Sequence, residues 1–164
     1  MDNNSNMILD EMMIEKWDKI VQEELTSILM LVKNFGNEMA RSKGGVILNI
    51  LSDLYFNPRG NIVGLMQNVK DISLIALTNG LVGLTKYIST YWNERCVRSN
   101  SLTIGASEEN SFLETHREDL LNQIPIGRFA NNDEFKAAVI FLVSDASSYL
   151  TGENIVINGG RTCW

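Results

Sequence analysis

DISLIALTNGLVGLTKYISTYW, residues Asp71 to Trp92, is the most regular stretch of the chain. Its apolar residues recur at helical spacing, every three or four positions, at Leu74, Leu77, Leu81, Leu84, Ile88 and Tyr91. Further apolar residues widen this stripe beyond what a surface helix buries, so we expect the helix to pack against two neighbours at once. Gly80 and Gly83 would each cost about 1 kcal/mol relative to alanine inside a helix, so we expect another backbone to lie close to them.

An apolar run and a second helical pattern precede this stretch. The run from Val46 to Leu51, broken only by Asn49, is typical of a strand covered on both faces in a parallel sheet. Ser52 follows it, at the carboxyl end where open α/β sheets place their ligand sites. From about Met12 to Arg41 the apolar residues keep helical spacing up to the stop at residues 44–45. These patterns predict an α/β domain.

Composition limits the class of protein. A chain of 164 residues with 45% hydrophobic content suits one domain with a real core. A net charge of -6 disfavours a nucleic-acid partner, because such proteins neutralise phosphates with lysine and arginine. Cys96 and Cys163 could form one bridge but fit no metal-ligand spacing, and free thiols are favoured.

The first residues, 1–11, are acidic and polar, and we expect a flexible tail there. They have neither the basic flank nor the apolar core of a signal peptide or a membrane span. We therefore expect a cytoplasmic protein that does not enter a membrane.

Several motifs together resemble the short-chain dehydrogenase/reductase family. Gly80-Leu-Val-Gly-Leu-Thr85, preceded by the strand Gly45 to Ser52, is similar to the family's catalytic helix and strand. Pro125-Ile-Gly-Arg-Phe129 with Asp133 resembles the entry to the family's last long helix. The resemblance covers nearly the whole chain from Trp17. The ending Gly-Gly-Arg-Thr-Cys-Trp looks most like a subgroup ending in GGWTAW, which includes oxidoreductases linked to flagellar or surface-sugar modification.

The resemblance implies a partial Rossmann fold corresponding to the later half of the family's sheet. We expect about three parallel strands near Val46 to Leu51, Val97 to Leu102 and Asn154 to Ile157, with helices on both faces. Residues 12–164 would form this domain without the family's cofactor-binding half. No glycine-rich phosphate loop precedes Trp17, so we expect the isolated chain to hold no cofactor, although the family uses NAD(P).

The family's site residues can be carried over position by position. Its YxxxK pair, a proton donor and a lysine that holds the nicotinamide ribose, falls on Leu74 and Thr78. Its catalytic serine falls on Ser52, and its active-site asparagine on Glu24, which we expect to be partly buried. The turn that approaches the nicotinamide has Ile104 in place of proline, followed by Gly105.

These positions also have simpler interpretations. Ser52 is either an active-site remnant or a polar strand end, and the second is favoured because its tyrosine and lysine partners are absent. Tyr55 could stand in as a proton donor, though a structural role is favoured. His116 lies in a polar run, which favours a solvated surface position over a catalytic base or metal ligand.

Three functions remain open on the sequence. The first is a catalytically inactive pseudoenzyme that assembles with itself or with an intact relative through helices 17–41 and 71–92. The second is an NAD(P)-dependent oxidoreductase, in surface-sugar or flagellin modification, that needs a cofactor half from another chain. The third is a decayed gene product without a function.

Overall fold

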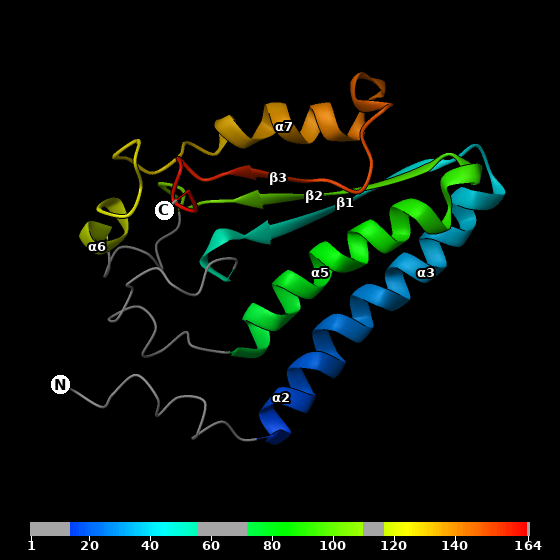
Figure 1. The fold of residues 1–164 in the computed structure, drawn as a ribbon, viewed down its shortest axis with the longest axis horizontal. Coiled ribbons are helices and arrows are strands. Elements are labelled where there is room, and N and C mark those ends of the chain that lie inside the picture. Colours follow the sequence, from blue (N-terminus) through cyan, green and yellow to red (C-terminus); the bar gives the residue numbers. More distant parts are fainter. Residues whose placement is uncertain (1–13, 56–71, 110–116, 164) are drawn as a thin grey trace.

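The computed structural model describes residues 14–55, 72–109 and 117–163, and the predicted tail, residues 1–11, lies outside them. Figure 1 shows a three-stranded sheet with helices on both faces, as predicted. The elements are α2 (Ile14–Ile20), η1 (Val21–Leu25), α3 (Thr26–Arg41), β1 (Gly45–Ser52), η2 (Asp53–Tyr55), α5 (Ile72–Tyr91), η3 (Asn93–Arg95), β2 (Val97–Ile104), α6 (Arg117–Leu121), α7 (Asp133–Val143), η5 (Asp145–Ser147) and β3 (Asn154–Ile157).

The sheet has the order β1-β2-β3, and both pairings are parallel. β1 pairs with β2 from Gly45 opposite Val97 to Ser52 opposite Ile104. The three predicted strands are confirmed, and β2 continues two residues beyond the predicted end. Within the described residues β1 pairs only with β2, and Ile50 is 57% exposed, so the prediction that this strand is covered on both faces is wrong at that residue.

Helices α3 and α5 cover one face of the sheet and α7 covers the other (Figure 1). The first long helix is confirmed from Ile14 onward, but it is not uniform. Residues Val21 to Leu25 form a π-helical turn between α2 and α3, with helical backbone angles on both sides of it. Such a turn accommodates one extra residue in a continuous helix, and no sequence pattern indicated it.

Helix α5 packs on the sheet through a face that is only partly apolar. Its buried residues are Ser73, Thr78, Leu81, Thr85, Ile88 and Ser89. The predicted stripe is therefore wrong in part, since Tyr91 is exposed and small polar residues take much of the contact. Two of these hydroxyls have partners in the helix or the sheet. Thr85 donates to the carbonyl of Leu81 at 2.8 Å and accepts from Asn49 of β1 at 2.9 Å, and Ser89 donates to the carbonyl of Lys86 at 2.7 Å.

α5 is also long and apolar enough to cross a membrane by length and composition alone. The core helix of a folded domain meets the same test. Here the helix lies against β1 and β2 of the sheet, which accounts for its apolar composition.

The close backbone approach predicted at Gly80 and Gly83 is also wrong within this chain. Both glycines are exposed, and nothing lies within 4 Å of where a Cβ would stand. The tight contact is at Gly36 of α3 instead, where a Cβ would overlap the ring carbon Cη2 of Trp92. Gly36 therefore lets α3 approach the end of α5.

Candidate functional site

The carboxyl ends of the three strands meet at one edge of the sheet, which is where ligands bind in open α/β folds. Ser52 ends β1 at this edge and is half-buried. Its Oγ accepts a hydrogen bond from the backbone N–H of Leu54 at 3.3 Å, which helps to form the turn that follows. Ser52 therefore lies at the predicted edge of the sheet, and its side chain also stabilises the turn after β1.

Leu74 and Thr78, the positions predicted to correspond to the family's tyrosine and lysine, lie one helical turn apart on α5. Thr78 is 7% exposed, whereas Leu74 is half-buried. Leucine has no proton to donate, and a threonine hydroxyl carries no positive charge to hold a ribose. The residue after Thr78, Asn79, donates to the backbone carbonyl of Tyr55 at 3.3 Å, so this part of α5 is joined to the turn after β1.

Glu24 lies in the π turn, and its side chain is exposed, so the expectation that it is partly buried is wrong. π turns occur frequently at functional sites, which makes Val21 to Leu25 the feature of this helix most worth comparing with intact relatives.

A buried ion pair lies directly beside Ser52 and was not predicted. Asp53 is 1% exposed, and its Oδ1 lies 3.3 Å from Nη1 of Arg161, which is 6% exposed. The same nitrogen donates to the backbone carbonyl of Asp53 at 3.3 Å. Burial raises the pKa of the Asp53 carboxyl above its ordinary value, and Arg161 and the nearby Asn158 side chain oppose that rise. The one sequence feature that could have indicated this pair is a charged residue, Asp53, directly after a strand predicted to be buried.

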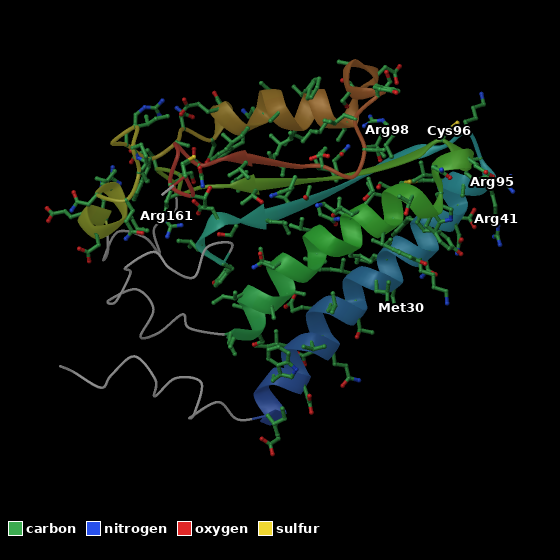
Figure 2. All side chains as sticks on the ribbon, viewed as in Figure 1. Met30, Arg41, Arg95, Cys96, Arg98 and Arg161 are labelled. Carbon is green, nitrogen blue, oxygen red and sulfur yellow. The ribbon has the colours of Figure 1, made fainter. Side chains whose placement is uncertain are left out.

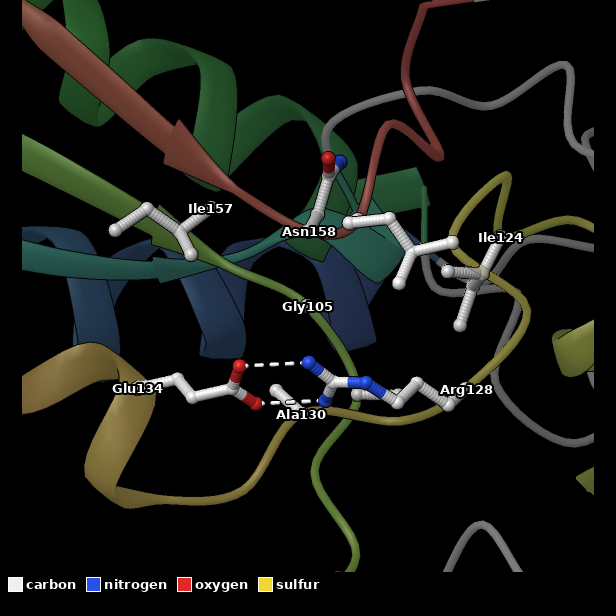
Figure 3. Close-up of a pocket in the computed structure, with 10 residues that line it drawn as sticks. Gly105, Ile124, Arg128, Ala130, Glu134, Ile157 and Asn158 are labelled. Carbon is white, nitrogen blue, oxygen red and sulfur yellow. Dashed lines mark hydrogen bonds and ion pairs between the residues drawn. The ribbon is translucent and has the colours of Figure 1, made fainter.

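A small hollow of about 80 Å³ lies at the ends of β2 and β3, with Gly105, Asn158 and Gly159 in its lining (Figure 3). Ile124, Ile126 and Ile157 supply apolar walls. Gly105 is needed there, because a Cβ would lie 2.8 Å from Cα of Asn158. The predicted turn of Ile104 and Gly105 thus lies at this hollow, which is far smaller than the roughly 300–1,000 Å³ of a pocket for a drug-sized ligand.

Arg128 and Glu134 form a bidentate ion pair at the side of this hollow (Figure 3). Nη1 and Nη2 of Arg128 each donate to one oxygen of the Glu134 carboxylate at 2.7 Å. Hydrogen bonds from Arg128 and from the backbone of Asn131 lower the pKa of Glu134 to about 2. The pair joins the turn before α7 to the first turn of that helix, which gives the Pro125 to Phe129 motif a structural role.

No cluster of His, Cys, Asp and Glu able to hold a metal occurs among residues 14–55, 72–109 and 117–163. His116 lies outside these residues. Cys96 and Cys163 are free and exposed, which confirms the prediction of free thiols.

Comparison with known proteins places these features in a family. Residues 2–162 match the family described as Enoyl-(Acyl carrier protein) reductase. The chain is 27% identical to 3-oxoacyl-[acyl-carrier-protein] reductase FabG of Staphylococcus epidermidis over 96% of its own length, and 30% identical to that of Pseudomonas aeruginosa. It spans 64% and 63% of the length of these two relatives.

Solved structures share the fold. The TT0495 protein from Thermus thermophilus superposes with a TM-score of 0.80 at 25% identity, covering 94% of this chain and 64% of that one. A candidate NAD(P) dependent gluconate 5-dehydrogenase from Beutenbergia cavernae, with bound NADP at low occupancy, superposes with a TM-score of 0.78 at 26% identity. That match covers 95% of this chain and 61% of the neighbour.

Proposed function

This chain belongs to the short-chain dehydrogenase/reductase family, and from that premise we propose that it is a non-catalytic member that acts by assembling with a second copy or with an intact relative. The observation that carries the proposal is the chemistry at two positions of α5. Leu74 and Thr78 stand where the family has its proton donor and its ribose-binding lysine.

The loss of these groups removes more than one part of the reaction. Proton transfer by a positioned side chain contributes about 10²- to 10⁴-fold to a rate, and leucine cannot supply it. Ser52 is still present at the carboxyl edge of the sheet. The next residue, Asp53, forms an ion pair with Arg161, so the turn that contains both residues has a structural role. Tyr55 follows in η2, and its backbone carbonyl accepts from Asn79. We assign both Ser52 and Tyr55 structural roles in the turn after β1.

These 164 residues contain no glycine-rich pattern of the kind that holds a dinucleotide before the first long helix. The dinucleotide folds hold the pyrophosphate on a glycine-lined helix N-terminus, and no such loop precedes Trp17. The Beutenbergia cavernae neighbour has NADP bound. For the present chain we propose that it binds neither NAD nor NADP by itself.

We assign the surface for assembly to the two long helices, predicted as residues 17–41 and 71–92, which the structure describes as α2 to α3 and α5. α3 and α5 lie next to each other (Figure 1), and each exposes large apolar side chains. Phe35 is 61% exposed on α3, and Tyr91 is 62% exposed on α5. Tyr87 and Tyr91 stack with ring centroids 5.7 Å apart, and both rings are exposed. Gly80 and Gly83 leave room on the same helix for the backbone of a partner.

Light scattering on the purified chain tests the assembly. We expect a dimer or larger species, either alone or after mixing with an intact family member, through a two-fold contact burying more than about 1,000 Å². A matched pair of variants locates the contact: F35S/Y91S should dissociate it, whereas V156S on β3 should not. A folded monomer under both conditions would reject the proposal and favour a gene product without function.

A second candidate function is supported by the relatives themselves. The matched proteins from Staphylococcus epidermidis and Pseudomonas aeruginosa are named as reductases. In this alternative the chain is a cytoplasmic NAD(P)-dependent oxidoreductase, in surface-sugar or flagellin modification, that works with a cofactor half from another chain. NADH- or NADPH-dependent turnover by the mixture, but by neither component alone, would favour it over the non-catalytic role.

A further inference from the structure

Two asparagines of the chain are followed directly by glycine, Asn79 before Gly80 and Asn158 before Gly159. The backbone nitrogen of the next residue can attack an asparagine side chain, and glycine leaves that nitrogen accessible because it has no Cβ. The attack also requires the backbone nitrogen and the side-chain carbon Cγ to meet. Whether they can meet depends on how the fold holds each pair.

Asn158 begins the turn that follows β3. Figure 2 labels Arg161, which belongs to the same turn, at the carboxyl ends of the strands. Gly159 has a positive φ of 65°, so the chain leaves the extended backbone of the strand at this residue. The N–H of Gly159 makes no hydrogen bond within residues 14–55, 72–109 and 117–163. In these ranges, therefore, no acceptor holds the nitrogen that would attack.

Hydrogen bonds orient the amide of Asn158 for this attack. Its Oδ1 accepts from the backbone N–H of Gly160 at 3.2 Å, an Asx-type turn that folds the side chain back over the Gly159 peptide. This donor polarises Cγ and stabilises negative charge that develops on Oδ1. Nδ2 donates to Oγ1 of Thr162 at 3.0 Å, so that hydroxyl lies where it can pass a proton to the leaving nitrogen.

Asn79 is held differently. Its Nδ2 donates to the backbone carbonyl of Ile75 at 2.9 Å and to that of Tyr55 at 3.3 Å. Gly80 lies inside α5, where a backbone N–H points along the helix to the carbonyl of the preceding turn. The helix therefore keeps the side chain of Asn79 and the nitrogen of Gly80 apart.

We propose that Asn158 is a site of self-modification, at which the side-chain amide is lost through attack by the Gly159 nitrogen. The bond from this nitrogen to Cγ forms and closes a succinimide ring, the bond from Cγ to Nδ2 breaks, and ammonia leaves with the proton of the Gly159 N–H. Water then opens the ring at one of its two carbonyls and gives aspartate or isoaspartate at residue 158. Water is the one co-reactant, and neither step needs an oxidant or a reductant.

The modification changes the charge beside a buried ion pair. The side chain of Asn158 interacts with that of Asp53, which is 1% exposed and pairs with Arg161. A carboxylate at residue 158 would add a like charge next to Asp53, and the two carboxylates would share one guanidinium. Deamidation therefore weakens the contact between the last turn of the chain and the end of β1.

Peptide mapping of the wild-type chain by mass spectrometry, after storage at mildly alkaline pH, tests the modification. In the folded chain we expect the peptide with Asn158 to gain about 1 Da, about tenfold faster than the peptide with Asn79 or more. Water enriched in oxygen-18 should add about 2 Da to that gain, because ring opening takes its oxygen from the solvent. In urea the two rates should be similar, because neither asparagine then has its folded surroundings.

A matched pair of variants locates the reaction. N158Q keeps an amide but closes a ring far more slowly, so it should lose the mass gain of the folded chain, whereas N79Q should keep it. N158D supplies the product, and its melting temperature should lie below that of the wild type. The wild-type map carries the test even if N158Q does not fold.

Two results of the mapping would overturn the proposal. One is equal rates at Asn79 and Asn158 in the folded chain, and the other is a mass gain at Asn158 that occurs only in urea. An N158D chain that melts together with the wild type would overturn the predicted effect on the last turn.

Discussion

The indole of Trp92 lies where a side chain on Gly36 would have to be, because a Cβ there would overlap the ring carbons Cη2 and Cζ3. This contact joins the second half of α3 to the residue that follows α5. We predict that G36A destabilises the fold by about 1–3 kcal/mol, because the ring must move in a packed site. Chemical denaturation of G36A and of the wild type measures this difference in the free energy of unfolding.

Gly83 supplies the matched control, since nothing lies within 4 Å of its Cβ position. G83A should stabilise the separated chain by up to about 1 kcal/mol, because alanine favours the helix. If the helix contacts a partner there, the same variant should also weaken assembly. Equal stability of G36A and wild type would contradict the packing argument.

Asp53 predicts an unusual dependence of stability on pH. Burial raises the pKa of its carboxyl above 3.8 in the folded chain, so the folded state holds this proton more tightly than the unfolded state does. Its contribution is fully present below pH 3.8 and is lost as the pH rises through the raised folded pKa. The free energy of unfolding of wild type minus that of D53N should therefore fall over this window. A difference that rises with pH would show that Arg161 outweighs burial.

Glu134 should behave in the opposite way. Its pKa is lowered to about 2, chiefly by Arg128, so its stabilising effect is present above its ordinary pKa of 4.5 and is lost as the pH falls towards 2. Carboxyl NMR titration should place its midpoint near 2, and R128M should move the midpoint up towards 4.5. An unchanged midpoint in R128M would assign the shift to the backbone of Asn131 instead.

Restoring the family's pair in the variant L74Y/T78K should give no reductase activity with NADH or NADPH. These 164 residues contain no glycine-rich phosphate loop before Trp17, so we expect this variant of the chain not to hold the hydride carrier. T78K places a lysine at a buried position, so circular dichroism must first show that the variant is folded. Turnover by a folded double variant would locate the defect in these two residues alone.

The wild-type chain should bind neither NAD nor NADP. Titration calorimetry measures this directly, with an intact family member as the positive control. Saturable binding at or below about 100 μM, which corresponds to roughly -5.5 kcal/mol, would contradict the prediction and would require a phosphate site that the sequence motifs do not indicate.

Sequence alone determined the order and type of the main elements, because hydrophobic period is a local property. The apolar run before Ser52 and the helical spacing from residue 71 to 92 located β1 and α5 almost to the residue. Counting along a motif needs no tertiary information, and it correctly put Ser52 at the end of β1. The assignment of Leu74 and Thr78 to the family's tyrosine and lysine positions stays a prediction.

Tertiary structure decided which surfaces meet. The sequence predicted close packing at Gly80 and Gly83, but the structure has it at Gly36. The presence of a glycine in a helix does not indicate which segment, if any, packs against it. Glu24 is exposed and lies in a π turn, which the apolar spacing of the sequence did not indicate. Asp53 and Arg161 are 108 positions apart in the sequence. Taken separately, each charged residue would be expected at the surface. Only the parallel sheet, which brings the end of β1 beside the last turn of the chain, makes them a buried pair.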